Sequence, residues 1–115
     1  MNTMIRTVFA FCFLFIALSF HPIKTQIVVT VRDELGNTVE GAKVSLFETE
    51  DDYTKEVNVA AEGETDEKGV VRIKELKPIS YYMIVRKGDK DNSGGGEQTG
   101  KLDANRINKV TVVIQ

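Results

Sequence analysis

Apolar and polar residues alternate along most of the chain from residue 26 onward. In QIVVTVRD (26–33), Ile27, Val29 and Val31 occupy one set of alternate positions, and Val28, Thr30 and Arg32 occupy the other. Successive side chains of a strand point to opposite faces, so this period of two in β-branched residues predicts a half-buried strand.

The same alternation recurs in later segments, at residues 41–48, 70–74, 81–86 and 106–115. Residues 56–62 alternate weakly, and we therefore predict five clear strands and two weak ones. The side chains predicted to face inward in the later segments are Ala42, Val44, Leu46, Val71, Ile73, Tyr81, Met83, Val85, Val110, Val112 and Ile114.

Two segments are predicted to be loops. Residues 49–56 are strongly acidic, and residues 87–101 are rich in glycine. No part of the region after residue 25 shows the apolar spacing of an amphipathic helix. Because each strand has one apolar face, two sheets must cover each other. The pattern predicts an all-β fold, a seven-strand antiparallel Greek-key β-sandwich over residues 26–115.

The first residues have a different character. Arg6 is followed, at residues 8–20, by the uninterrupted apolar run VFAFCFLFIALSF. A positive start and a short apolar stretch predict a secretory signal, since a membrane-spanning helix needs about 20 apolar residues. Ala17 and Ser19 supply small residues for a peptidase. We predict a signal peptide at residues 1–25, cut between about 19 and 26, with an uncleaved anchor as the alternative.

Composition narrows the function further. Cys12, the only cysteine, lies in the apolar run behind Phe9, Ala10 and Phe11, which do not form a lipid-attachment motif, so residues 26–115 have no disulfide to stabilise them. The chain has 15 basic and 17 acidic side chains, and two basic ones precede residue 26, which leaves a formal charge of −4 afterwards. This mild acidity argues against nucleic-acid binding, which usually needs a basic patch.

Two motif blocks have a recognisable spacing. The first is a strand, Asp-x-x-Gly, an apolar residue and Gly-Ala; the second is Thr-Asp-x-x-Gly, a strand, Leu, Pro and a strand with tyrosine. In this chain the motif residues are Asp33, Gly36, Val39, Gly41, Ala42, Thr65, Asp66, Gly69, Leu76, Pro78 and Tyr81. Both blocks resemble the carboxypeptidase regulatory-like domains, which are transthyretin-like or prealbumin-like sandwiches. Ile79 departs from the pattern, where the family commonly has glycine.

The resemblance covers about residues 26–86 and implies an exported accessory or structural module without catalytic residues. The catalytic residues of related enzymes are missing from this chain when the positions are compared one by one. Hydroxyisourate hydrolases and intradiol dioxygenases use histidine, and the only histidine, His21, precedes the predicted domain. Adhesin-type sandwiches form a crosslink from a lysine at the place that Val31 occupies. We predict no enzyme, although catalysis by paired carboxylates remains an alternative.

One loop has a partial likeness to a calcium site. Asp89, Asp91 and Ser93 alternate, and Glu97 follows at position nine, but position twelve is Gly100 instead of a bidentate glutamate. We expect no cofactor and a solvated loop, with calcium ligation by these four residues or contact with a partner as alternatives.

A second candidate is an outward row of apolar side chains, Phe47, Tyr82, Ile84 and Val113. If neighbouring strands bring them together, they form an exposed patch for a partner; if strand order scatters them, they need no explanation. The sequence thus predicts a secreted or periplasmic, non-catalytic module. Its role is structural or binding, with a protein or glycan partner at the cell envelope and no membrane insertion after cleavage. The alternative is a calcium-dependent binding module that uses residues 89–97.

Overall fold

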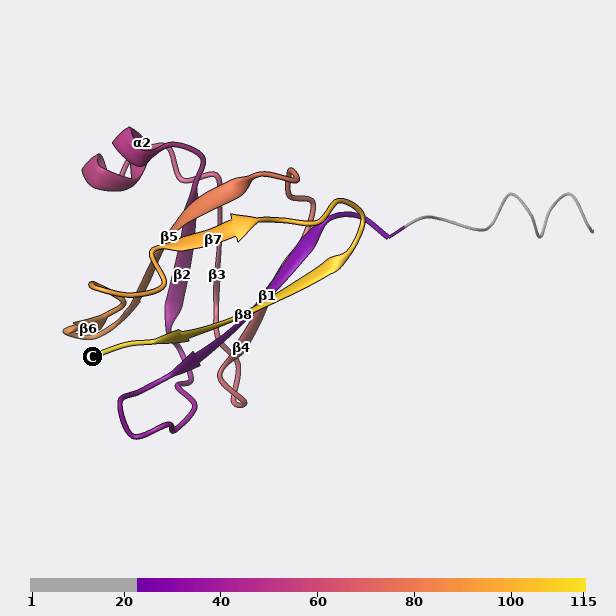
Figure 1. The fold of residues 1–115 in the computed structure, drawn as a ribbon. Helices are drawn as coiled ribbons and strands as arrows, with labels where there is room; N and C mark the ends of the chain where they lie inside the picture. The colour runs from indigo at the N-terminus through magenta and orange to yellow at the C-terminus, as the bar shows by residue number, and fades with distance from the viewer. Residues whose placement is uncertain (1–22) are drawn as a thin grey trace, which may run out of the picture.

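The computed structural model describes residues 23–115, which form two packed β-sheets (Figure 1). Sheet A has the order β4 (Val70–Ile73), β1 (Gln26–Arg32), β8 (Ile107–Val113). Sheet B has the order β3 (Ala61–Glu64), β2 (Lys43–Phe47), β5 (Ser80–Lys87), β6 (Lys90–Asp91), and β7 (Gln98–Lys101) also pairs with β5. The predicted all-β sandwich is confirmed.

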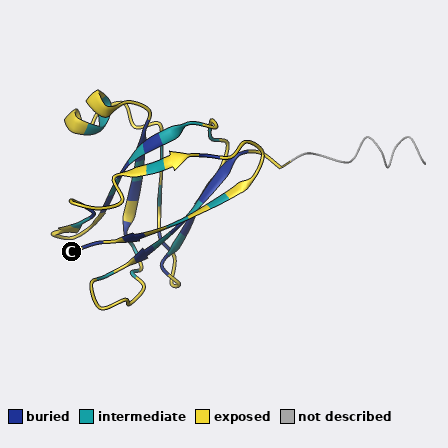
Figure 2. Ribbon diagram, in the orientation of Figure 1, coloured by how far each residue is buried: buried dark blue, intermediate teal, exposed yellow. Residues whose placement is uncertain are grey.

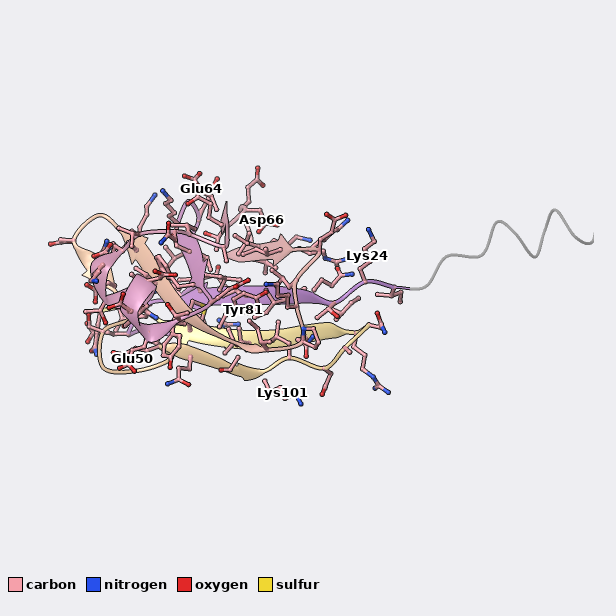
Figure 3. All side chains as sticks on the ribbon, turned by 90° about the horizontal axis from the view of Figure 1, so that it is seen from above. Lys24, Glu50, Glu64, Asp66, Tyr81 and Lys101 are labelled. Carbon is pink, nitrogen blue, oxygen red and sulfur yellow. The ribbon has the colours of Figure 1, made fainter. Side chains whose placement is uncertain are left out.

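The core lies between the sheets, where the inward set of each strand is buried (Figure 2). Ile27, Val29 and Val31 of β1 face Val44 and Val85 of sheet B, and all five side chains have no exposed surface. Figure 3 shows Tyr81 between the layers while the charged side chains project outward. Period-two burial across every long strand therefore supplies the apolar core that stabilises a chain without disulfides.

Two features of the sheets differ from the sequence expectation. The described residues contain eight strands, since the predicted loop 87–101 contributes β6 and β7. In addition, β8 pairs with β1 in parallel, with Val29 opposite Val110. Alternation specifies which face of a strand is buried and is silent about strand direction, so the all-antiparallel expectation was wrong for this pair.

The predicted loop 49–56 contains a helix, α2 (Glu50–Lys55). Thr49 caps it, because its side chain accepts a hydrogen bond from the Asp52 N–H at 3.1 Å. Acidic residues fill its first turn, and Lys55 lies in the last turn, which suits the helix dipole. The polarity that suggested a loop is thus the polarity that stabilises a short surface helix.

The motif residues maintain turns and strand entries. Asp33 Oδ1 accepts bonds from the N–H groups of Leu35 and Asn37, and Asp66 Oδ1 does the same for Lys68 and Val70. Buried Thr65 donates its hydroxyl to the Val39 carbonyl at 2.6 Å and accepts the Ala42 N–H at 2.9 Å. The Tyr81 hydroxyl accepts the Lys77 N–H at 2.9 Å. These contacts fix the ends of the strands.

The predicted signal peptide and its cysteine lie outside the described residues, apart from residues 23–25. Thr25 is buried, accepts the Asn105 N–H on its hydroxyl at 2.8 Å, and accepts the Leu76 N–H on its carbonyl at 3.0 Å. Thr25 is therefore part of the folded unit. Within residues 23–115 there is no helix with the length and apolar character that a membrane crossing requires.

Candidate functional site

The outer face of sheet B carries a recess beneath α2, which we call the α2 cleft. It has a volume of about 210 Å³ and lies between α2, strand β5 and the start of the glycine-rich loop. Its lining residues are Tyr53, Thr54, Glu56, Ile84, Arg86, Asp91, Asn92 and Ser93. The cleft thus combines Ile84 of the predicted apolar row with Asp91 and Ser93 of the predicted calcium loop.

A second recess of about 170 Å³ adjoins the first on the side of β2 and β3, where Lys43, Phe47 and Glu62 contribute to its lining. Ile84, Arg86 and Glu56 line both recesses. The ion pair between Arg86 and Glu56 therefore lies between the two recesses, which belong to one surface.

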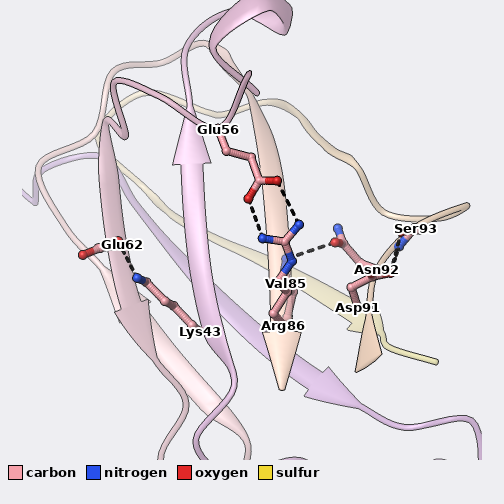
Figure 4. A network of polar contacts seen from close by, with 8 residues as sticks. All are labelled: Lys43, Glu56, Glu62, Val85, Arg86, Asp91, Asn92 and Ser93. Atoms are coloured by element: carbon pink, nitrogen blue, oxygen red, sulfur yellow. Dashed lines mark hydrogen bonds and ion pairs between the residues drawn. The ribbon is translucent and has the colours of Figure 1, made fainter. Parts of the chain in front are cut away.

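The Glu56–Arg86 pair is bidentate (Figure 4). Arg86 Nη1 donates to Glu56 Oε1, and Arg86 Nη2 donates to Glu56 Oε2 at 3.0 Å. Glu56 ends α2 with a left-handed φ of 53°, which directs its side chain back over β5. The Arg86 guanidinium lowers the pKa of the Glu56 carboxyl, and that carboxylate raises the pKa of Arg86. Both side chains are about half exposed, at 46% and 50%, so water screens the pair and its contribution to stability is small.

The aromatic residues beside the cleft pack under α2. Tyr53 lies edge-on to Phe47, with ring centroids 6.2 Å apart, and tilted over Tyr82 at 5.7 Å. Burial, together with the carboxylates of Glu97 and Asp91, raises the pKa of Tyr53. Tyr53 is a wall residue that sequence reasoning missed, because the helix carrying it was interpreted as loop.

The predicted row of exposed apolar side chains is divided by this packing. Phe47 lies opposite Tyr82 on neighbouring strands, but α2 covers it and only 2% of it is exposed. Val113 lies on β8 of the other sheet and is 51% exposed. The expectation of Phe47 as an exposed residue was wrong, because local alternation does not reveal that a helix will fold over the outer face. Tyr82 and Ile84 remain half-buried beside the cleft.

The glycine-rich loop is organised by its own polar side chains. Asp91 Oδ1 accepts the Ser93 N–H at 2.9 Å, and the hydrogen bonds from Ser93 lower the pKa of Asp91. Glu97 Oε1 accepts the Gly94 N–H at 3.0 Å. Among residues 23–115, no three carboxylate, histidine or cysteine side chains converge as metal ligands. Calcium ligation by Asp89, Asp91, Ser93 and Glu97 stays a prediction.

Asn92 anchors the loop and was not anticipated from the sequence. It is 4% exposed; its Oδ1 accepts the Val85 N–H at 3.0 Å, and its Nδ2 donates to the Met83 and Gly96 carbonyls. The only sequence signal was an asparagine before a glycine run, which is typical of any turn. The side chain of Asn92 therefore makes hydrogen bonds to the β5 backbone that a neighbouring strand would otherwise make, at the point where the loop leaves the sheet.

The chemistry of the cleft favours binding over proton transfer. A general acid or base works best with a pKa near the working pH. The pKa values of Glu56 and Asp91 are lowered, and their oxygens are committed to Arg86 and Ser93. The remaining acceptor sites of these carboxylates, the guanidinium of Arg86 and the ring of Tyr53 offer hydrogen bonds and an apolar contact to a polar partner.

Comparisons with known proteins identify a similar fold without a family. No family model matches the chain, and no curated protein matches its sequence. The fold is similar to that in the crystal structure of the group B streptococcus pilus 2b backbone protein, with a TM-score of 0.52 and 21% sequence identity. The similarity covers 79% of this chain and 40% of the pilus protein. It supports the sandwich fold alone.

Proposed function

We propose that this chain is an exported, non-catalytic β-sandwich module with a binding or structural role at the cell envelope, secreted or periplasmic. The observation that carries the proposal is the α2 cleft, whose ionised side chains are held in place by a helix cap, an ion pair and a turn. Fixed donors and acceptors on a rigid sheet are suited to recognition.

Three observations outside the cleft support export and an envelope role. The apolar run at residues 8–20 follows a basic residue, as in a secretory signal. The motif blocks resemble carboxypeptidase regulatory-like domains, and the similar solved fold belongs to a pilus backbone protein. A protein or a glycan at the envelope is the partner that we expect.

The test is capture of envelope components by residues 23–115, with wild-type protein and an Ile84→Ser, Arg86→Ala double variant. We expect the double variant to lose the captured partner while it keeps a cooperative melting transition. Lys68→Ala, in an exposed turn that does not line the cleft, is the matched control and retains the partner. Equal capture by all three proteins would show that the cleft does not bind the partner. Accumulation of the full chain in the cytosol would contradict export.

A further inference from the structure

Strand β8 forms an edge of sheet A, with one open side (Figure 1). The Arg106 carbonyl accepts the Gln26 N–H at 3.1 Å, and the Ile114 N–H donates to the Arg32 carbonyl at 2.9 Å. The even-numbered positions therefore bond to β1. In a parallel pair, the backbone groups of alternate residues point to opposite sides. The backbones facing the open side belong to Ile107, Lys109, Thr111 and Val113.

The two sides of the sandwich are not equivalent. On one side β3 packs on β4 so closely that a Cβ added to Gly63 would lie 2.7 Å from Val71 Cγ2. On the other side β7 and β8 both end their sheets, and no pairing joins them in the described chain. At the end of the chain, Gln115 and Asp91 exchange backbone hydrogen bonds of 3.0 and 3.2 Å across this side.

A recess of about 300 Å³ lies between β8 and the glycine-rich loop. Residues 93–96 form one wall, and Thr111, Val112, Val113 and Gln115 form the other. Cβ atoms added to Gly94 and Gly95 would meet no heavy atom within 4 Å, so the loop leaves space beside the strand. An extended chain has room to approach the open backbone of β8 here.

The outer face of sheet A is basic. Its exposed side chains include Arg32 on β1, Arg72 and Lys74 at β4, and Lys109 in the middle of β8. The three strands of this sheet contain no aspartate or glutamate. Within residues 23–115, the ion pairs involve none of these four cations. In a chain of net acidic charge, this face is complementary to carboxylates.

We propose that β8 binds an extended acidic segment of a partner protein, which adds to sheet A as a further strand. The partner's backbone bonds to the open groups of β8, and its alternate side chains divide between the two faces. One set covers half-buried Val110, and the other places carboxylates beside Lys109. The proposal goes beyond the function above and uses a surface separate from the α2 cleft.

A second copy of this chain fits the same edge less well. Two β8 strands pairing antiparallel about Lys109 would set the two lysines opposite each other, and like charges at opposite positions destabilise a sheet. The same lysine pairs favourably with a glutamate from another protein. Charge therefore favours an acidic partner over self-association.

The probe is a synthetic peptide of about nine residues, a common strand length, in which valine alternates with glutamate. We expect it to bind residues 23–115 in calorimetry and to slow amide hydrogen exchange at Ile107, Lys109, Thr111 and Val113. Amides of the even positions are already bonded to β1, so their exchange changes less. A peptide with lysine in place of glutamate is the matched control and does not bind.

Two variants test the mode of binding. Thr111→Pro removes a backbone donor on the open side and leaves the β1 ladder intact, so it abolishes peptide binding without unfolding the sandwich. Lys109→Glu leaves the backbone untouched and weakens binding by about ten-fold or more. Lys101→Glu, on exposed β7, is the control for charge reversal.

The proposal would be overturned by slowed exchange confined to α2 cleft residues, by no binding of the glutamate peptide, or by dimerisation of the chain through β8 that excludes the peptide. If Thr111→Pro leaves a native envelope partner bound while the cleft variant loses it, the edge proposal fails and the proposed binding function stands.

Discussion

At the residue scale, two motif glycines with the same backbone conformation have different surroundings. Gly36 and Gly69 have φ values of 85° and 74°, where a side chain is strained. A Cβ at position 36 would meet nothing within 4 Å, whereas one at position 69 would lie 2.7 Å from Thr38 Cβ and 2.9 Å from the Val39 nitrogen. Gly36 is needed only for the backbone conformation of its own turn, while Gly69 also allows two turns to pack together.

We therefore expect the alanine variants of these glycines to differ in stability. Gly36→Ala costs about 1 kcal/mol for the left-handed backbone. Gly69→Ala adds the cost of overpacking, for a total of about 3 kcal/mol. Urea unfolding monitored by circular dichroism measures both. Equal losses would show that the contact between the two turns is unimportant.

Asn92 is the residue on which the glycine-rich loop depends. Asn92→Ala leaves the Val85 N–H and the Met83 carbonyl without their partner in a buried place. We expect a loss of about 2–4 kcal/mol, since each unsatisfied buried group costs about 1–3 kcal/mol. Ser93→Ala, one residue further in an exposed position, is the control. Its free energy of unfolding stays within about 1 kcal/mol of wild type when both variants are unfolded in urea.

At the scale of elements, α2 acts as a cover for the outer face of sheet B. Tyr53 joins the helix to Phe47 and Tyr82 through ring contacts, and Glu56 joins it to Arg86. None of the helix residues is fully buried. A six-residue helix is marginal by itself, so these contacts with the sheet keep it folded.

Tyr53→Ala tests this relation. We expect the variant to lose about 1–2 kcal/mol and to expose Phe47, because aromatic pairs contribute about 0.5–1.5 kcal/mol beyond area burial. Hydrogen exchange of the α2 amides should accelerate before global unfolding. Thr54→Ala, on the same helix, is exposed and leaves exchange near the wild-type rate. A Tyr53→Ala protein with an unchanged exchange rate in α2 would contradict the role of the ring contacts.

At the scale of the whole molecule, the charged side chains in the strands of sheet A are all basic, whereas the strands of sheet B carry both signs. The basic side chains of sheet A carry no acidic neighbours within their strands, while sheet B lies under the acidic helix. The glycine-rich loop lies at the edge between the faces, beside the α2 cleft on one side and the β8 recess on the other. Conditions that reorder this loop would therefore act on both candidate surfaces.

Calcium is the ligand that tests the loop most directly. In the described structure, Asp91 and Glu97 already accept hydrogen bonds from Ser93 and Gly94, and a metal would have to replace those contacts. We expect millimolar calcium to leave the melting temperature of residues 23–115 unchanged. A rise that Asp91→Asn abolishes and Asp103→Asn preserves would instead establish a calcium site at residues 89–97.

The sequence by itself determined the faces of the strands. Inward positions such as Val29, Val44 and Val85 are buried as the alternation predicts, because period-two burial is a local property of an extended chain. The turn aspartates are equally local, since each bonds to backbone within a few residues. For the same reason the two-layer sandwich was predictable.

Tertiary structure decided everything that depends on distant neighbours. The direction of β8 and the ion pair between Arg86 and Glu56 join segments far apart in the chain. Tyr53 of α2, which packs on nearby Phe47, also packs on distant Tyr82 of β5. Alternation is the same for parallel and antiparallel pairs, and for an outer face that is bare or covered. The cleft and the open edge exist only once the two sheets have packed. Packing determines which backbone N–H and C=O groups and which polar side chains remain exposed.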